Sequence, residues 1–247
     1  MVEYPVGATG ATFQIIEALA AVERAGVTEL AEELGRSKGS VHDHLATLEQ
    51  LGYVVNEGGE YRLGLGFLEL GTGVRRREKL YRVGRREVEQ LASSSGETAS
   101  LVVEEAGEAV FLYRNGHGAD ATLRDGSRVP LYACGAGKAI LANRPPAAVG
   151  TALRGDVEGA TDRTLVDEDE LRRELQTVRD QGLAFDRGEL DPDRRSVAAP
   201  VVDDDGRAAG AVAVSGPTDR MTGKRFEEDV PGLVLSSANA ITVEFVN

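Results

Sequence analysis

The sequence contains no tryptophan, one cysteine, and no apolar run of about 18 residues, the length that a membrane-spanning helix requires. A lone cysteine excludes an internal disulfide framework and favours a reducing compartment, so we expect a cytoplasmic protein. No membrane association is expected, and the N-terminal MVEYPVGATG lacks the basic and apolar regions of a signal peptide. With 247 residues, 41% of them hydrophobic, the chain is long enough for one large or two small folded domains.

Lysine is also scarce, since only four of the 28 cationic residues are lysines, against 41 acids and a net charge of −13. Such a surface is typical of halophilic proteins, in which dense carboxylates hold water and high salt screens their repulsion. An ordinary acidic protein is the alternative, and composition does not separate the two. Residues 1–90 carry a net charge of −3 and residues 91–247 a net charge of −10, so the N-terminal part is better suited to approach phosphate.

Two short helices are predicted in succession near the N-terminus. Thr28 is a suitable N-cap for a helix over residues 28–34, and Gly35 suits its end. Ser37 then caps a second helix, which Gly52 ends. Four apolar residues lie on one side of this second helix at helical spacing: Val41, Leu45, Leu48 and Leu51.

A hairpin and an earlier helix complete this part of the chain. Residues 53–63 contain two β-prone runs around a glycine-rich turn, which predicts the hairpin. Residues 11–25 predict a helix that Gly26 ends, with a core face made by Phe13, Ile16, Leu19 and Ala20. Helix, turn, helix and hairpin is the layout of a winged helix-turn-helix, in which the second helix enters the major groove of double-stranded DNA.

The candidate DNA-contacting residues lie off the apolar side of the second helix and on the elements beside it. They are Thr28, Ser37, Lys38, Gly39, Ser40, His42, Asp43, Thr47 and Arg62. The alternative is an exposed helix with no function. His42 and His44 do not predict a metal site, because residues two apart on a helix point about 200° apart; His44 is expected to be partly packed. Glu57 and Glu60 would be repelled by phosphate, so the hairpin is expected to lie off the groove.

Residues 67–91 are expected to form a helix that links two domains, with one interruption at residues 71–73. This helix carries seven cations: Arg75, Arg76, Arg77, Lys79, Arg82, Arg85 and Arg86. Contact with phosphates is one interpretation of them, and a solvated face paired with nearby glutamates is the other. The predicted domains are therefore a winged helix-turn-helix over residues 1–66, a linker helix over residues 67–92 and a further domain over residues 93–247.

Beyond Gly96, strand and helix patterns alternate without a regular βαβ rhythm. Strands are predicted over residues 98–103, 109–113, 121–123, 183–186, 196–202 and 209–215. Helices are predicted over residues 138–142, 167–182 and 233–245. Together these patterns predict an α+β domain with a mainly antiparallel sheet.

Four blocks of this second half resemble the effector domain of the IclR family of transcriptional regulators. They are GSRVPLYACGAGKAILA at 126–142, GLAFD at 182–186, SVAAPV at 196–201 and AVAVSGP at 211–217, with Arg220 close behind. The blocks occur in the order of the family, and the resemblance covers about residues 11–245. It implies a winged helix-turn-helix, a linker helix and a GAF-like effector domain. It also implies homodimers through the DNA-binding domains, often paired into tetramers, and a small effector, frequently a carboxylate.

The resemblance also implies a ligand site and shows where this chain departs from the family. The implied ligand-binding residues are Gly135, Ala136, Asp186, Ser196 and Ser215. Ser196 stands where relatives have cysteine, and Ala213 replaces a serine. Asp193 and Arg194 stand where relatives have a glycine followed by an apolar residue. In the second helix of the DNA-binding domain, Asp43 stands where many relatives have arginine.

The segment GAGK at residues 135–138 is not a phosphate-binding P-loop, because Tyr132 and Ala139 occupy two positions that the motif requires. Backbone N–H groups at a helix start attract an anion, and Lys138 is expected to add charge for it. Tight packing is the alternative reason for the glycines. Asp186 is expected to accept a ligand hydroxyl or to cap local backbone. Arg194 and Arg195 either clamp an acidic ligand or pair with nearby aspartates.

These observations predict a DNA-binding transcriptional regulator that senses a small metabolite, a carboxylate or a sugar acid. No cofactor and no metal is expected, and no enzymatic activity, since Cys134 would need a nearby histidine base to act as a nucleophile. Two alternatives stay open: a DNA-binding architectural protein without an effector, and a small-molecule-binding protein or enzyme with a vestigial winged helix.

Overall fold

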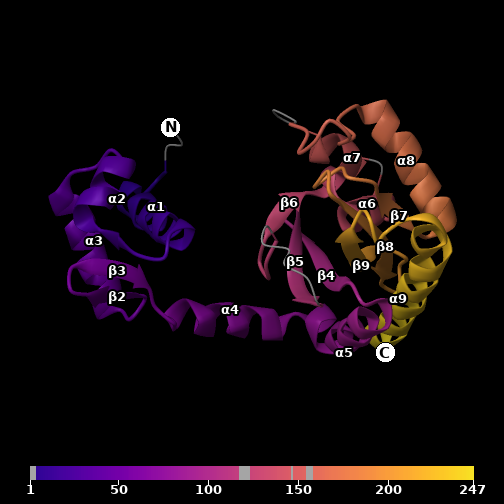
Figure 1. The fold of residues 1–247 in the computed structure, drawn as a ribbon, viewed down its shortest axis with the longest axis horizontal. Coiled ribbons are helices and arrows are strands. Elements are labelled where there is room, and N and C mark those ends of the chain that lie inside the picture. Colours follow the sequence, from indigo (N-terminus) through magenta and orange to yellow (C-terminus); the bar gives the residue numbers. More distant parts are fainter. Residues whose placement is uncertain (1–3, 117–122, 146, 154–157) are drawn as a thin grey trace. The chain divides into compact units, whose positions relative to one another are not determined.

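The structure, a computed structural model of the 247-residue chain, describes residues 4–116, 123–145, 147–153 and 158–247. The chain divides into two compact units, residues 1–75 and 76–247, which fold around separate cores (Figure 1). The described part of the chain contains no helix that is long and apolar enough to cross a membrane.

The first unit packs three helices with a small antiparallel sheet. The elements as far as the end of the unit are α1 (Gly7–Ala21), β1 (Ala25–Gly26), α2 (Val27–Glu33), α3 (Lys38–Gln50), β2 (Val54–Glu57), β3 (Glu60–Leu63) and α4 (Gly66–Arg77). The strands pair in the order β1-β3-β2, so the predicted hairpin is confirmed and gains a third strand. Gly58 and Gly59 both have positive φ, as the two-residue turn between β2 and β3 requires.

The second helix of the predicted pair, α3, forms as expected. The Ser37 hydroxyl accepts a hydrogen bond from the Ser40 N–H at 3.2 Å and caps the helix. Three of the four apolar residues predicted for its inner side, Val41, Leu45 and Leu48, are buried. Leu51 is 64% exposed, contrary to prediction, because the helix ends at Gln50 and the chain turns before Leu51 reaches the core.

Helix α1 differs from prediction in its position and in the side that it buries. It spans Gly7–Ala21 and ends before β1, and Gly26 is a strand residue rather than the helix stop. Its buried positions include Ala11, Ile15, Ala18 and Leu19, while Phe13 is 57% exposed. The helix is apolar on more than one side, so spacing alone did not select the buried face.

The predicted linker helix is two helices, and the interruption lies elsewhere than expected. Gly71 and Gly73 lie inside α4, and the helix breaks at Glu78, which precedes α5 (Lys79–Ser95). No residue of α4 is buried, whereas α5 buries an apolar side against the second unit. The break therefore falls where the chain meets a packed core and not at the glycines, each of which costs a helix interior only about 1 kcal/mol.

The second unit is built on one antiparallel sheet of six strands. Its remaining elements are β4 (Thr98–Glu105), β5 (Glu108–Asn115), β6 (Arg128–Pro130), a 3-10 turn (Leu131–Ala133), α6 (Gly135–Ala142), α7 (Ala147–Ala152), α8 (Glu168–Gln181), β7 (Ala184–Asp186), β8 (Arg194–Val202), β9 (Ala208–Pro217), a π-helical turn (Arg225–Asp229) and α9 (Val230–Val246). The strand order is β6-β5-β4-β9-β8-β7 and every pairing is antiparallel, so the predicted α+β class is confirmed. Helix α7 was not predicted, and most of the strand predicted over residues 121–123 lies outside the described residues.

The two faces of this sheet pack against different helices, because successive side chains of a strand point to opposite faces. Val212 and Val214 of β9 belong to the cluster that includes α5 and α9, while Ala211 and Ala213 belong to the cluster that includes α6 and α8. The alanines leave room for α6 to lie close to the sheet, and every residue of α6 is buried. The first residues of α6 are thereby placed beside the ends of β7, β8 and β9.

Candidate functional site

A row of polar side chains crosses three neighbouring strands of the sheet. The register pairs Asp186 of β7 with Ser196 of β8, and Ser196 with Ser215 of β9. Paired residues in register point to the same face of a sheet. Three predicted ligand residues that lie up to 29 positions apart in the sequence are therefore neighbours in the structure.

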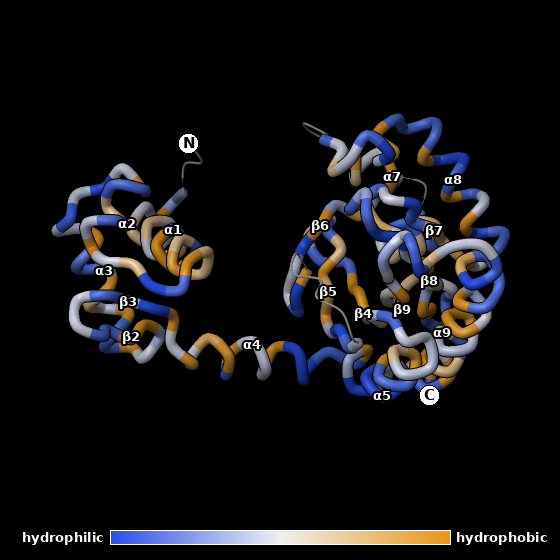
Figure 2. The backbone as a smooth tube through the Cα atoms, in the orientation of Figure 1, coloured by the Kyte–Doolittle hydropathy of each residue, from blue (hydrophilic) through white to orange (hydrophobic). Residues whose placement is uncertain are grey.

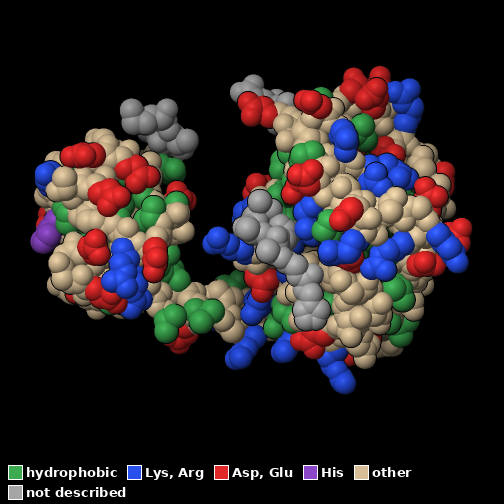
Figure 3. Space-filling model, in the orientation of Figure 1, with side chains coloured by type: hydrophobic (Ala, Val, Ile, Leu, Met, Phe, Trp, Pro, Cys, Tyr) green, Lys and Arg blue, Asp and Glu red, His purple; other side chains and the backbone are tan. Residues whose placement is uncertain are grey.

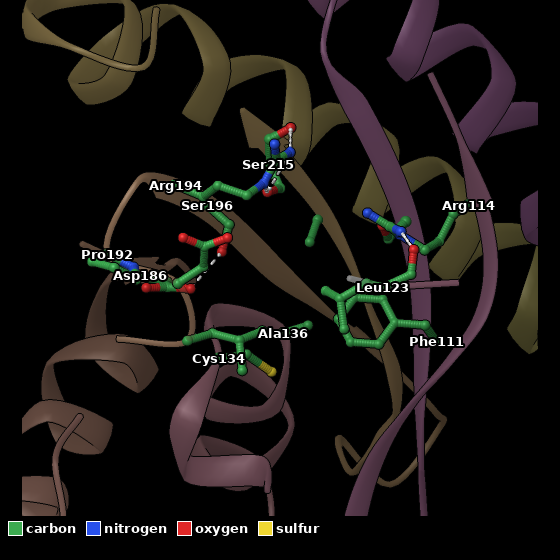
Figure 4. A pocket seen from close by; sticks show the side chains of 14 residues that line it. Phe111, Arg114, Leu123, Cys134, Ala136, Asp186, Pro192, Arg194, Ser196 and Ser215 are labelled. Atoms are coloured by element: carbon green, nitrogen blue, oxygen red, sulfur yellow. Dashed lines mark hydrogen bonds between the residues drawn. The ribbon is translucent and has the colours of Figure 1, made fainter. Parts of the chain in front are cut away.

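This row borders a cavity of about 240 Å³ in the second unit (Figure 4). Its lining residues are Ser100, Phe111, Arg114, Leu123, Cys134, Ala136, Asp186, Leu190, Asp191, Pro192, Arg194, Ser196, Ala213 and Ser215. Four of the five predicted ligand residues are among them. The wall made by Phe111, Arg114 and Leu123 was not predicted, because these residues belong to no motif; a buried serine in the apolar strand β4, Ser100, was the available signal.

Gly135 does not line the cavity, but the site depends on its lack of a side chain. A Cβ atom at this position would lie 2.9 Å from the Ser196 hydroxyl oxygen. The start of α6 consequently lies directly against the polar row. Ala136, the next residue, does face the cavity, so the implied role of this segment combines close packing with contact to the cavity.

Cys134 caps α6, and its thiol is not activated as a nucleophile. Its Sγ accepts a hydrogen bond from the Gly137 N–H at 3.3 Å. Burial raises the pKa of the Cys134 thiol to about 12, although the Gly137 N–H acts in the opposite direction. The thiol is therefore protonated at neutral pH, and the third histidine of the chain, His117, lies outside the described residues.

Lys138 does not add charge to the cavity, contrary to prediction. Its side chain is fully buried, and its ammonium donates to Glu189 Oε1 at 2.6 Å, to the Phe185 carbonyl at 2.7 Å and to Glu174 Oε1 at 3.3 Å. The ion pair with Glu189, neither residue of which lines the cavity, ties α6 to the loop that follows β7. Its role in the described structure is to hold that loop in place.

The same loop positions Asp186. One carboxylate oxygen, Oδ1, accepts hydrogen bonds from the N–H groups of Gly188 at 3.0 Å and Glu189 at 2.7 Å. The other, Oδ2, accepts a long hydrogen bond of 3.5 Å from the Ser196 hydroxyl. Burial raises the pKa of Asp186, against the lowering effect of these N–H groups and of Lys138.

Adjacent arginines at the start of β8 point to opposite faces of the sheet. The Arg194 guanidinium lies at the cavity, where Nε and Nη2 donate to Ser215 Oγ at 3.3 and 3.2 Å (Figure 4). Arg195 donates to the Met221 carbonyl at 2.9 Å, and its guanidinium lies 5.5 Å from the centre of the Phe226 ring. Of the two arginines predicted as a clamp, Arg194 lines the cavity and Arg195 does not.

The candidate DNA-contacting residues of the first unit form an exposed edge along α3. Lys38, His42, Asp43 and Thr47 are exposed on this helix, and Thr28 is exposed on α2. The remaining candidates, Ser37, Gly39, Ser40 and Arg62, are exposed or half-buried. His44 is half-buried and lies 2.9 Å from the Thr12 hydroxyl, as predicted. No group of three metal-ligating side chains occurs among the residues that the structure describes.

The charged side chains of the hairpin form ion pairs within the first unit. Glu57 pairs with Arg62 at 2.8 Å and with Arg24 at 2.7 Å, and the Arg62 side chain hydrogen bond holds the pKa of Glu57 below its usual value. Residues 1–66 carry only four cations against ten acids, and acidic side chains are spread over the visible face of this part (Figure 3). The lower negative charge of residues 1–90 therefore comes from the arginines that follow the winged helix.

A winged helix-turn-helix followed by a sheet domain with a polar-rimmed cavity defines a DNA-binding regulator with an effector-binding domain. Residues 12–58 match the IclR helix-turn-helix domain, and residues 73–243 match the C-terminal domain of the bacterial transcriptional regulator IclR. The chain belongs to the IclR family of transcriptional regulators, which in general are not enzymes.

Individual relatives cover nearly the whole chain. The chain is 36% identical to the probable HTH-type transcriptional regulator ArcR of Halobacterium salinarum, over 93% of this chain and 90% of that protein. Thermotoga maritima IclR has the same fold, with a TM-score of 0.84 at 24% identity over 98% and 99% of the two chains. An IclR homologue from Microbacterium hydrocarbonoxydans, solved in complex with 4-hydroxybenzoate, has a TM-score of 0.79 at 19% identity over 95% and 98%.

Proposed function

We propose that this regulator senses a small carboxylate or sugar acid in the cavity beside α6. The observation that carries the proposal is the combination of Arg194, Ser196, Ser215 and Asp186 around about 240 Å³ of space. An engineered apolar cavity of about 150 Å³ holds benzene, so this one has room for a ligand of roughly ten non-hydrogen atoms. The 4-hydroxybenzoate that a structural neighbour binds is a carboxylate of that size.

We propose that α3 enters the major groove of double-stranded DNA. The proposed contacts are Thr28, Ser37, Lys38, Gly39, Ser40, His42, Asp43 and Thr47, with Arg62 at the hairpin. The exposed start of α3 supports this assignment, since base contacts in such domains come from the N-terminal part of the second helix. Because Glu57 pairs with Arg62, the hairpin contributes little positive charge.

The proposed working form is a homodimer that assembles through the first unit. Helix α4 buries none of its residues, and Leu68, Leu70 and Val74 are each more than half exposed. Hydrophobic stretches along α4 are visible in Figure 2. A helix of 12 residues is marginal in water without tertiary packing, so α4 needs a cover. The exposed Phe13 of α1 borders a groove of the same unit. A second copy of the chain supplies matching apolar surface by symmetry.

Sedimentation of the full chain tests the dimer. The wild type is expected to sediment as a dimer or as a pair of dimers. Leu68→Glu places a charge on the exposed apolar side of α4 and is expected to yield monomers, whereas Glu69→Gln on the same helix is expected to leave the assembly unchanged. A wild-type monomer at micromolar concentration would refute this form.

The proposed response to the effector is a change in DNA affinity. Neighbouring residues of strand β4 point to opposite faces of the sheet. Ser100 lines the cavity, and Leu101 packs against α5, the helix that follows α4 in the sequence. A ligand alters DNA binding only to the extent that it prefers one arrangement of the chain over another. As a DNA-binding regulator, the protein is expected to act in the cytoplasm.

A mobility-shift titration on the promoter of its own gene, at several salt concentrations, tests the regulatory function. We expect specific binding with a shallow dependence on salt, with a log–log slope below about 6 in magnitude, because few cations on the DNA face release few counterions. A slope near −10 would contradict this electrostatic picture. Absence of specific binding at every salt concentration would overturn the function itself.

A further inference from the structure

We propose that a group of exposed cations at the start of the second unit binds the backbone phosphates of the DNA that the first unit recognises. This inference rests on the proposed function and adds a second contact surface to it, one that does not depend on base sequence. The group, here called the basic segment, consists of six exposed residues: Arg76, Arg77, Lys79, Arg82, Arg85 and Arg86. Figure 3 shows Lys and Arg side chains gathered around the end of α4 and along α5.

The basic segment concentrates one sign of charge in an otherwise acidic chain. Residues 76–86 hold six cations and a single acid, Glu78, which gives a net charge of +5, whereas the whole chain has a net charge of −13. Like charges four positions apart on a helix repel each other, as Arg82 and Arg86 do. This repulsion costs stability in the chain alone, and a polyanionic partner removes the cost.

Two of these arginines are already engaged within the protein. The Arg85 guanidinium donates to Glu89 Oε1 at 2.8 Å, and the same oxygen accepts from the Tyr113 hydroxyl. Arg82 Nη1 donates to the backbone carbonyl of Arg77 at 2.9 Å and thereby ties the start of α5 to the end of α4. The role of these two side chains is therefore structural.

Three other arginines have no acidic partner. Among the residues that the structure describes, no carboxylate forms an ion pair with Arg76, Arg77 or Arg86. The Lys79 ammonium lies over an aromatic ring, 4.9 Å from the centre of the Phe245 side chain. A guanidinium is a planar fork that forms two parallel hydrogen bonds with a phosphate. Arg76, Arg77 and Arg86 are therefore the phosphate contacts of the basic segment.

The exposed side of α5 carries a line of positive charge. Lys79, Arg82 and Arg86 follow one another at steps of three and four positions, which places them on one side of the helix. Leu80 and Val88 are buried on the other side, in the cluster that packs against the sheet. The packing of α5 therefore fixes these cations at the surface of the second unit.

The first unit needs such a surface because its own charge opposes DNA binding. Residues 1–66 hold four cations and ten acids, a net charge of −6. Two of the four cations, Arg24 and Arg62, are paired with Glu57. Double-stranded DNA carries one negative charge for about every 1.7 Å of its axis, so an acidic domain alone is repelled from it. The basic segment offsets nearly all of that net charge, and α4 tethers it to the DNA-binding unit.

A second copy of the chain is the competing partner for the basic segment, because residues 91–247 carry a net charge of −10. DNA fits better for two reasons. The segment follows the DNA-binding unit directly in the sequence, and that unit lacks the cations that a phosphate-binding surface requires.

Two other arginines provide matched controls. Arg85 is adjacent to Arg86 on α5 and is exposed as well, but it pairs with Glu89. Arg173 is an exposed arginine of α8, a helix that packs on the other face of the sheet. A general effect of removing one positive charge would appear in all three substitutions, whereas loss of a phosphate contact would appear only at Arg86.

Titration of the full chain against its own promoter and against a random-sequence duplex of equal length, at several salt concentrations, tests the proposal. Arg86→Gln is expected to weaken binding to both duplexes by the same factor, at least about fivefold at low salt. It is also expected to lower the magnitude of the log–log salt slope by about 2, since a dimer loses two phosphate contacts. Arg86→Lys keeps the charge and is expected to retain most of the affinity. Arg85→Gln and Arg173→Gln are expected to change the affinity by less than about twofold.

A triple variant tests the whole group. Arg76→Gln/Arg77→Gln/Arg86→Gln is expected to lose most of the salt dependence, while its thermal unfolding and its sedimentation without DNA match those of wild type. Wild-type affinity and slope in this variant would refute the phosphate contacts. Dissociation of its DNA-free assembly would also overturn the proposal, because it would show that these cations join copies of the chain.

The random-sequence duplex separates this inference from the function on which it rests. If wild type prefers its promoter and the arginine variants bind both duplexes as wild type does, the inference fails while the regulatory function stands. If wild type binds the two duplexes equally, the regulatory function fails, and the variants still decide on phosphate contact with either duplex.

Discussion

The two compact units of this chain differ in whether they bury charged side chains. Every buried charged side chain among the described residues lies in the second unit: Glu97, Lys138, Asp186 and Glu189. The first unit buries apolar side chains and keeps its charges at the surface, where Glu57 pairs with Arg24 and Arg62. A DNA-contacting face must be exposed, whereas in the second unit Asp186 lines the cavity and the Lys138–Glu189 pair holds the loop that positions it.

Buried charges make the second unit dependent on a few ion pairs. Glu97 is one example, because both of its carboxylate oxygens accept from Arg220, at 2.9 and 2.7 Å, and Oε1 also accepts from Arg225 at 3.2 Å. The Lys138–Glu189 pair is the other, beside Asp186. The first unit lacks such contacts among its described residues, so its stability depends on apolar packing. Four substitution experiments sharpen this contrast, from the largest expected effect to the smallest.

Lys138→Met is expected to have the largest effect. It leaves the buried Glu189 carboxylate without its ammonium partner, and loss of one member of a buried pair costs about 3–5 kcal/mol. We expect a lower midpoint of urea unfolding, followed by circular dichroism. The double variant Lys138→Met/Glu189→Leu removes both charges and is expected to recover much of the loss. A single variant as stable as wild type would show that this pair does not hold the second unit together.

Leu45→Ala probes the apolar core of the first unit. Leu45 is fully buried in α3, and such a truncation costs about 2–5 kcal/mol because it removes buried area and leaves a cavity. Leu51→Ala is the matched control, since Leu51 is 64% exposed, and its cost is expected to stay within about 0.5 kcal/mol. Thermal unfolding of both variants checks the prediction. Equal costs would mean that Leu51 is covered in solution.

The pH dependence of stability is expected to have opposite signs at Glu97 and Asp186. Burial alone would raise the pKa of Glu97, but Arg220 and Arg225 hold it below its ordinary value of 4.5. Its contribution to stability is therefore present above pH 4.5 and is lost as the pH falls through the lowered pKa. Burial raises the pKa of Asp186 above 3.8, so its contribution is present below pH 3.8 and is lost as the pH rises through the raised pKa.

Two isosteric variants separate these contributions. Glu97→Gln is expected to flatten the acid side of the stability curve and to cost about 1–2 kcal/mol at neutral pH, less than a fully buried pair because the two arginines are about half exposed. Asp186→Asn is expected to flatten the loss that accompanies rising pH. Urea unfolding from pH 3 to pH 8 measures both slopes, and slopes of the same sign would contradict the assignment.

Asp43→Asn is expected to have the smallest effect and concerns only DNA. The Asp43 side chain is 87% exposed on α3, so its loss should not change stability. Removing one negative charge near a phosphate is worth about 1 kcal/mol in water, which predicts roughly fivefold tighter promoter binding at low salt. Glu49→Gln, near the end of the same helix, is the control and is expected to have less effect. Weaker binding by Asp43→Asn would show that the carboxylate contacts a base instead.

Sequence reasoning located the winged helix well because its signals are local. Ser37 caps α3, Gly35 and Gly52 have the positive φ that a helix end favours, and Gly58 and Gly59 form the hairpin turn. It was wrong where more than one side of a helix was apolar, or where a helix could break at more than one position. Phe13 and Leu51 are apolar but exposed, and Gly71 and Gly73 lie inside a helix that breaks at Glu78.

The sequence by itself determined the winged helix-turn-helix and the antiparallel α+β class of the second unit, because caps, turns and apolar periodicity act over a few residues. Four of the residues that line the cavity were implied by the resemblance of the sequence blocks to the IclR family. Only the tertiary structure decided that Arg194 and not Arg195 reaches the cavity, and that Lys138 forms a buried ion pair with Glu189. It also decided that Phe111 and Arg114 form the cavity wall across from Asp186 and Ser196 (Figure 4). These outcomes depend on strand register and helix packing between distant segments, and a shift of one residue in register moves a side chain to the other face.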